Sequence, residues 1–150
     1  MRHRQRRLHD SSFDGNALSC DVGSGDITIR GARAERIATD SGSGDVQVEE
    51  ADAAELVADS GSGNIHLQAR GARLARVKAD TGSGDVRIEL DPDSGFEIHA
   101  DQGSGDIQSR FRDAEPILKD RTVVGYRRGD GHIRIRVETG SGDLVVEPSR

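Results

Sequence analysis

A four-residue word, G-S-G followed by D or N, occurs six times in the chain. The copies begin at Gly23, Gly42, Gly61, Gly82, Gly103 and Gly140, so the intervals are 19, 19, 21, 21 and 37 residues. Such near-constant spacing is typical of repeat proteins, in which each repeat packs against its neighbours. The longer last interval indicates one irregular segment before the final copy.

Apolar and polar residues alternate on both sides of each copy, and this period of two predicts β-strands. The apolar column before the turn is Leu18, Ile37, Leu56, Val77, Ile98 and Ile135, and the column after it is Ile27, Val46, Ile65, Val86, Ile107 and Leu144. A single strand–turn–strand repeat cannot bury its apolar face, whereas stacked repeats can. We therefore expect an all-β fold: a single-domain parallel β-solenoid, or β-helix, of about six rungs with two main strands per rung.

Outward positions of the first strand carry charges whose signs mostly alternate between copies: Arg36, Glu55, Arg76, Glu97 and Arg134. Strands about 4.8 Å apart would turn these residues into a ladder of opposite charges that helps to fix the register. Aromatic residues make up only 3% of the chain, so the core is expected to consist of small aliphatic side chains. Cys20 is the single cysteine and is expected to be buried in a strand.

The repeats predict a solenoid domain over residues 13–147. Residues 107–138 break the period and are expected to form an irregular segment and a C-terminal β-hairpin-like cap. The basic segment 1–12 is predicted to be a disordered tail, and 148–150 a short second tail.

The net charge of −6 provides no overall positive field, so nucleic acid is not an expected partner. No apolar stretch follows the basic N-terminus, which predicts neither a secretory signal nor membrane insertion. The sequence as written therefore predicts a cytoplasmic location, with the cell surface as the alternative if the chain is a fragment.

The repeated words resemble the bacterial putative-adhesin family of β-strand-repeat domains of unknown function. The resemblance rests on residues 40–46 (DSGSGDV), 80–86 (DTGSGDV) and 136–144 (RVETGSGDL). It spans about residues 13–147 and implies a β-helix with an adhesive role. The family provides no catalytic residue that could be transferred to this chain.

Two columns of acidic residues flank the turns. They are Asp21, Asp40, Asp59, Asp80, Asp101 and Glu138 before the turn, and Asp26, Asp45, Asn64, Asp85, Asp106 and Asp143 after it. Each side chain could accept backbone N–H bonds within its own turn. Alternatively, the stacked carboxylates could bind Ca²⁺, as glycine- and aspartate-rich β-rolls do. The candidate calcium ligands are Asp40, Asp45, Asp80, Asp85, Asp101 and Asp106, and no other cofactor is expected.

The leading functional hypothesis is a non-enzymatic scaffold or interaction module that binds a protein or a polysaccharide. Its candidate interaction face is the outward row Thr28, Gln47, His66, Arg87 and Gln108. The alternatives are the Ca²⁺-binding β-roll and, third, a polysaccharide-active β-helix enzyme. The tripeptide Arg128-Gly129-Asp130 spells an integrin-recognition word, but a chain this rich in the three residues contains it readily by chance.

Overall fold

The computed structural model describes residues 7–11, 17–70, 74–92 and 95–148. Every helix or strand assigned within these ranges is a β-strand, so the described chain contains no helix with the length and apolarity of a membrane span. The strands are β1 (Arg7–Ser11), β2 (Ala17–Val22), β3 (Asp26–Arg30), β4 (Arg33–Ser41), β5 (Val46–Ser60), β6 (Ile65–Ala69), β7 (Arg76–Ser83), β8 (Val86–Leu90), β9 (Phe96–Ser104), β10 (Ile107–Ser109), β11 (Glu115–Lys119), β12 (Thr122–Arg128), β13 (Ile133–Ser141) and β14 (Leu144–Pro148).

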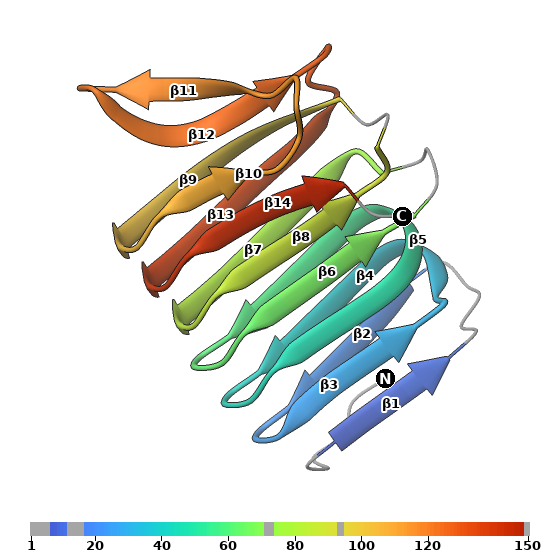
Figure 1. The fold of residues 1–150 in the computed structure, drawn as a ribbon. Coiled ribbons are helices and arrows are strands. Elements are labelled where there is room, and N and C mark those ends of the chain that lie inside the picture. The colour runs from blue at the N-terminus through green and yellow to red at the C-terminus, as the bar shows by residue number, and fades with distance from the viewer. Residues whose placement is uncertain (1–6, 12–16, 71–73, 93–94, 149–150) are drawn as a thin grey trace.

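The strands stack in two layers with the core between them (Figure 1). Sheet A has the order β1-β3-β5-β6-β8-β14-β10, and sheet B has the order β2-β4-β5-β7-β13-β9-β12-β11, with the long strand β5 in both. All pairs are parallel except those that β12 makes with β9 and β11. Equivalent apolar residues lie opposite one another, as Ile37 does with Leu18 and Leu56. The all-β prediction and the predicted pairing of equivalent columns are therefore confirmed.

Buried hydroxyl groups connect successive turns. Ser41 Oγ lies 2.9 Å from the carbonyl oxygen of Gly25, in the preceding turn, and 3.0 Å from that of Ser43, in its own turn. The equivalent hydroxyls of Ser60, Thr81 and Thr139 contact the same two carbonyl positions. Since a buried carbonyl without a partner is costly, a small hydroxyl at this position stabilises the stack. These hydroxyl positions are not among the columns predicted from the repeats.

The order of the strands in space differs from their order in the chain. The last two strands, β13 and β14, lie between β7 and β9 in sheet B and between β8 and β10 in sheet A (Figure 1). Arg134 consequently lies opposite Arg76 on one side and Glu97 on the other. The predicted alternation of charges fails here because the final repeat returns into the stack instead of extending it.

A buried carboxylate holds this inserted strand pair in sheet A. The side chain of Glu147, in β14, is only 8% exposed and forms ion pairs with Arg87 of β8 and, at 3.3 Å, with Arg110 just beyond β10. Arg87 lies in the strand on one side of β14, and Arg110 directly follows the strand on the other side. Because a buried carboxylate needs such partners, Glu147 favours the position of β14 between β8 and β10.

The segment 107–138, predicted as irregular and a cap, divides into three parts. It contains β10 in sheet A, the antiparallel hairpin β11–β12 at the end of sheet B, and the first part of β13. The cap prediction is wrong for residues 133–138, because β13 has a parallel neighbour on both sides. At the hairpin end, the rings of Phe96 and Phe111 pack with centroids 4.9 Å apart, and the Arg128 guanidinium lies over the Phe111 ring.

The predicted disorder of residues 1–12 is wrong for residues 7–11, which form β1 and pair in parallel with β3. Residues 1–6 and 12 lie outside the described residues, as do 149–150 of the second predicted tail. Cys20 is 1% exposed, in agreement with the prediction that it is buried.

Candidate functional site

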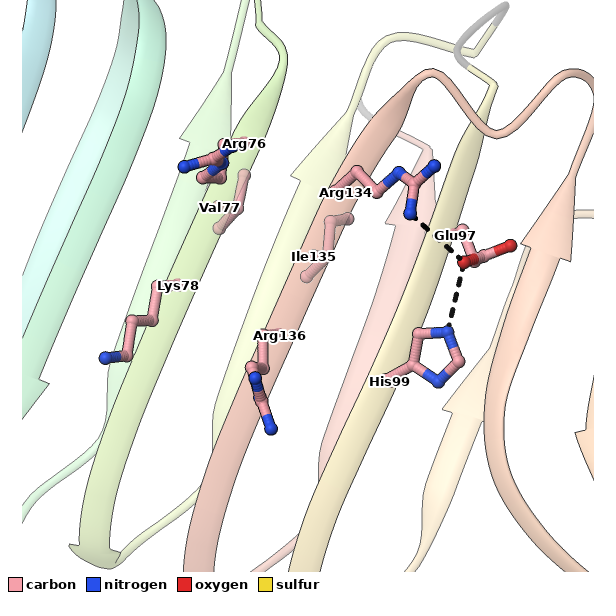
Figure 2. A pocket seen from close by; sticks show the side chains of 8 residues that line it. All are labelled: Arg76, Val77, Lys78, Glu97, His99, Arg134, Ile135 and Arg136. Carbon is pink, nitrogen blue, oxygen red and sulfur yellow. Dashed lines mark hydrogen bonds and ion pairs between the residues drawn. The ribbon is translucent and has the colours of Figure 1, made fainter. Parts of the chain in front are cut away.

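Five basic side chains gather on the outer face of sheet B, over β7, β13 and β9 (Figure 2). They are Arg76, Lys78, Arg134, Arg136 and His99, and with Val77, Glu97 and Ile135 they line an open hollow of about 550 Å³. Alternate residues of a strand point to the same side, so each of the three strands contributes two side chains to this surface. We call this surface the basic hollow.

The positive charge of the basic hollow is only partly compensated. Its one carboxylate, Glu97, lies 3.1 Å from His99 Nε2 and 3.9 Å from Arg134 Nη1, and it is shared with Arg127 at 3.9 Å. Among the described residues, Arg76, Lys78 and Arg136 form no close ion pair, although Glu55 lies opposite Arg76 in register and the charge of Lys78 acts on Asp59. The lining itself thus contains four permanent cations and one carboxylate, a formal excess of three positive charges in a chain whose net charge is −6.

The pKa of Glu97 reflects these neighbours. The hydrogen bond with His99 lowers the pKa of the Glu97 carboxyl below its ordinary value, and the charges of Arg134 and Arg127 lower it further. Glu97 therefore stays ionised at neutral pH, and it orients His99 and Arg134 at one side of the hollow.

The predicted interaction face lies on sheet A. The register across adjacent strands begins at Thr28 and continues through Gln47, His66 and Arg87. Val145 of the inserted β14 then separates Arg87 from Gln108. Three polar side chains of this face have partners within the protein: Gln47 Nε2 donates to Glu49 at 2.6 Å, His66 contacts Glu89, and Arg87 pairs with Glu147.

A second hollow of about 490 Å³ lies on this face, and its charges balance. Its lining includes two arginines and two glutamates: Arg87, Arg110, Glu89 and Glu147. Because the cations there are matched by carboxylates, this face offers less electrostatic attraction to a charged ligand than the basic hollow does. The role of this sheet A face as an interaction face stays a prediction.

The second acidic column forms a ladder that joins the turns. Asp85 Oδ1 accepts the backbone N–H of Asp143 at 2.9 Å, and Asp143 Oδ1 accepts that of Asp106 at 2.9 Å. The same bond joins Asp26 to Asp45, Asp45 to Asn64 and Asn64 to Asp85. Each side chain thus accepts a bond from the next turn in the stack rather than from its own turn, which corrects the prediction. Asn64 fits the ladder because an amide oxygen accepts equally well.

The six predicted calcium ligands are divided between two columns. Asp40, Asp80 and Asp101 belong to the column before the turn, whereas Asp45, Asp85 and Asp106 belong to the hydrogen-bonded ladder after it. Within the part of the chain that the structure describes, no group of three or more His, Cys, Asp or Glu side chains is placed to hold a metal ion. Calcium binding stays a prediction from the sequence.

Like charges crowd at the centre of the first column. Asp59 lies opposite Asp40 on one side and Asp80 on the other. Burial raises the pKa of the Asp59 carboxyl, and the charges of Asp40 and Asp80 raise it further, against an opposing effect of Lys78. The ionised form of Asp59 is therefore disfavoured in the folded state.

Asp59→Asn is expected to raise the free energy of unfolding by about 0.2–1 kcal/mol at pH 7, because it removes the repulsion between adjacent like charges. Because the pKa of Asp59 is raised in the folded state, its charge destabilises the fold only at pH values at which Asp59 is ionised. The gain in the free energy of unfolding should therefore disappear as the pH falls below the ordinary aspartate range. Urea unfolding of the wild-type protein and of Asp59→Asn at pH 7 and pH 3 measures this difference in the free energy of unfolding. Asp52→Asn, which removes the partner of Arg33, is the control and should give no gain. A gain from Asp59→Asn that persists at pH 3 would contradict the electrostatic explanation.

The tripeptide Arg128-Gly129-Asp130 is engaged with its own protein. The Arg128 side chain is 19% exposed and its guanidinium lies 5.0 Å from the Phe111 ring centroid. Asp130 Oδ1 lies 2.8 Å from His132 Nδ1. The Arg128 side chain therefore does not extend freely from the turn, whereas the Asp130 carboxylate is 75% exposed beside His132.

Sequence reasoning missed the basic hollow. The segments RVK (76–78) and RIR (134–136) could have revealed it, since each alternates outward cations with a buried apolar residue. Their adjacency could not be found in this way, because it depends on the insertion of β13 beside β7.

Comparisons with known proteins found a family that matches the sequence and a solved structure with a similar fold. The sequence matches the Toastrack DUF4097 family over residues 8–147. Among solved structures, a putative cell adhesion protein from Clostridium sporogenes ATCC 15579 has a similar fold, with a TM-score of 0.59 and 14% identity over 97% of this chain and 93% of that one. No curated protein matches the sequence. These findings confirm the resemblance to putative adhesins of unknown function.

Proposed function

The chain belongs to the Toastrack DUF4097 family, and we propose that it is a non-enzymatic interaction module that binds an anionic ligand in the basic hollow. This proposal places the binding surface on sheet B instead of on the sheet A row that the sequence suggested. The ligand lies across β7 and β13, where it contacts the side chains of Arg76, Lys78, Arg134 and Arg136.

The observation that carries the proposal is the uncompensated charge. The chain is acidic overall, yet four cations in the basic hollow face a single shared carboxylate. Adjacent like charges repel one another, and an anionic ligand relieves that repulsion when it binds. Such a surface also speeds association with an oppositely charged partner.

The form of the surface favours reversible binding over catalysis. The side chain of Arg134 is 75% exposed and that of His99 is 54% exposed, so both groups are in contact with solvent. Catalytic groups are usually held in a fixed geometry and shielded from water. The exposed arginines instead suit a ligand that binds through many weak ionic contacts.

The double variant Arg134→Ser/Arg136→Ser is expected to weaken binding to a sulfated dextran by about 2- to 30-fold, because each exposed ionic contact contributes about 0.2–1 kcal/mol. Calorimetry at low and at physiological salt measures the affinity, and the variant should also show a weaker dependence on salt.

The matched control is Arg33→Ser/Arg36→Ser, which removes two cations from β4 in the same sheet. These arginines pair with Asp52 at 3.9 Å and Glu55 at 3.3 Å and lie outside the basic hollow. Affinity should hardly change in the control. An equal loss in both double variants would mean that only net charge matters and would overturn the proposed surface, as would an absence of binding by the wild-type protein.

A further inference from the structure

The basic hollow exists only because β13 is inserted between β7 and β9. In register, Arg134 lies opposite Arg76, and Arg136 lies opposite Lys78, so the insertion brings like charges together across adjacent strands. On its other side, β13 places Arg134 opposite Glu97 and Arg136 opposite His99. The unfavourable contacts of the inserted strand are therefore concentrated on the β7 side.

A stack without the insertion would lack this repulsion. If β9 followed β7 directly in the same register, Arg76 would lie opposite Glu97, and Lys78 would lie opposite His99. The turns would also match, because Asp85 and Asp106 hold equivalent positions on either side of Asp143 in the ladder. On charge alone, sheet B would favour the stack without the insertion. The ion pairs of Glu147 in sheet A favour the inserted arrangement instead.

An anion that crosses β7 and β13 changes this balance. It would contact cations from β7 and β13 together and remove the repulsion between them. A small single anion at exposed side chains gains little, because each contact is weak and screened. A chain of anionic groups engages several cations at once, so that each further contact forms at a high effective concentration.

The surroundings of the hollow indicate the chemical class of that chain. The lining residues include no Phe, Tyr or Trp, whose larger rings are the usual stacking platforms for nucleic-acid bases, and Val77 and Ile135 are buried, so they offer no apolar anchor to a peptide. Beyond the cations runs the acidic column with Asp80, Glu138 and Asp101 opposite one another in register. This column confines an anion to the band that crosses the strands. A sulfated or carboxylated polysaccharide fits a narrow, open band of cations.

We infer that an anionic polysaccharide segment bridges β7 and β13 and thereby holds the C-terminal strand pair β13–β14 in its inserted position. The inference rests on the proposed function of the basic hollow and adds the ligand class and its effect on the fold. Ligand binding and strand insertion are then linked, so each favours the other.

Hydrogen exchange measured by mass spectrometry tests the inference, with a short heparin oligosaccharide as the probe. The informative amides are those of β14, which belongs to sheet A, whereas the ligand lies on the outer face of sheet B. At a probe concentration of 100 times its Kd, amides of β13 and β14 should exchange up to about 100-fold more slowly. Amides of β4 and β6 should change little.

Each other result has a distinct meaning. Slower exchange in β13 alone would show local shielding and overturn the bridging effect while the proposed function stands. Equal slowing in β4, β6 and β14 would show general stabilisation and also overturn it. Inorganic sulfate at equal charge should give no slowing in β14, and poly-L-glutamate should give less than heparin. An equal effect from either would overturn the polysaccharide as the ligand class, and no binding of any probe would overturn the proposed function itself.

Discussion

Gly142→Ala is expected to lower the free energy of unfolding by about 2 to 6 kcal/mol, because Gly142 has both an unusual backbone conformation and no space for a side chain. Its φ is 135°, a region that residues with a Cβ rarely adopt. A Cβ at this position would collide with the carbonyl oxygen of Gly84 in the neighbouring turn. On the opposite side of Gly142, Gly105 packs in the same way against the Gly142 carbonyl. Urea unfolding followed by far-UV circular dichroism measures the loss.

The control is Gly23→Ala, in the first turn of the stack. A Cβ on Gly23 would meet no atom within 4 Å, and its φ is outside the positive range. The control should change stability by less than about 0.5 kcal/mol, as is usual for a surface substitution. Equal losses at Gly142 and Gly23 would show that the close approach of turns is not the reason for the repeated glycine.

Phe96→Ala is expected to lower the free energy of unfolding by about 3–5 kcal/mol, the usual range for removing a buried aromatic ring. Phe96 is 0% exposed and packs against Phe111, whose ring also supports the Arg128 guanidinium. The measurement is again urea unfolding, with Phe96→Leu as the control that keeps most of the volume and should cost less than about 1.5 kcal/mol. A loss from Phe96→Ala no larger than that of the control would contradict a packed aromatic closure at the hairpin end.

Much of the local structure could be predicted from the sequence. The alternation of apolar residues, together with the repeated turn, placed Leu56 opposite Ile37 and Val77 in adjacent strands, as the structure has them. This succeeds because a shift of one residue would turn every apolar side chain of a strand toward solvent. The aliphatic core follows from the same columns, although the Phe96–Phe111 contact does not, since neither residue belongs to a repeated column.

The order of the strands could not be predicted, and the basic hollow depends on it. All six turns carry nearly the same word, so the edge formed by β7 and β8 can accept either the next repeat or the last one. The choice depends on particular contacts such as that of Glu147 with Arg87 and Arg110, which spacing does not reveal. Candidate residues chosen from a sequential stack therefore fell on sheet A, whereas the unmatched cations lie on sheet B.

Nuclear Overhauser effects between backbone protons of sheet A test the strand order most directly, because these effects report which strands are adjacent in solution. The inserted arrangement predicts contacts that join Leu144 to Val86 on one side and to Ile107 on the other. Contacts that join Val86 directly to Ile107, with Leu144 adjacent to only one of them or to neither, would contradict the insertion and, with it, the basic hollow.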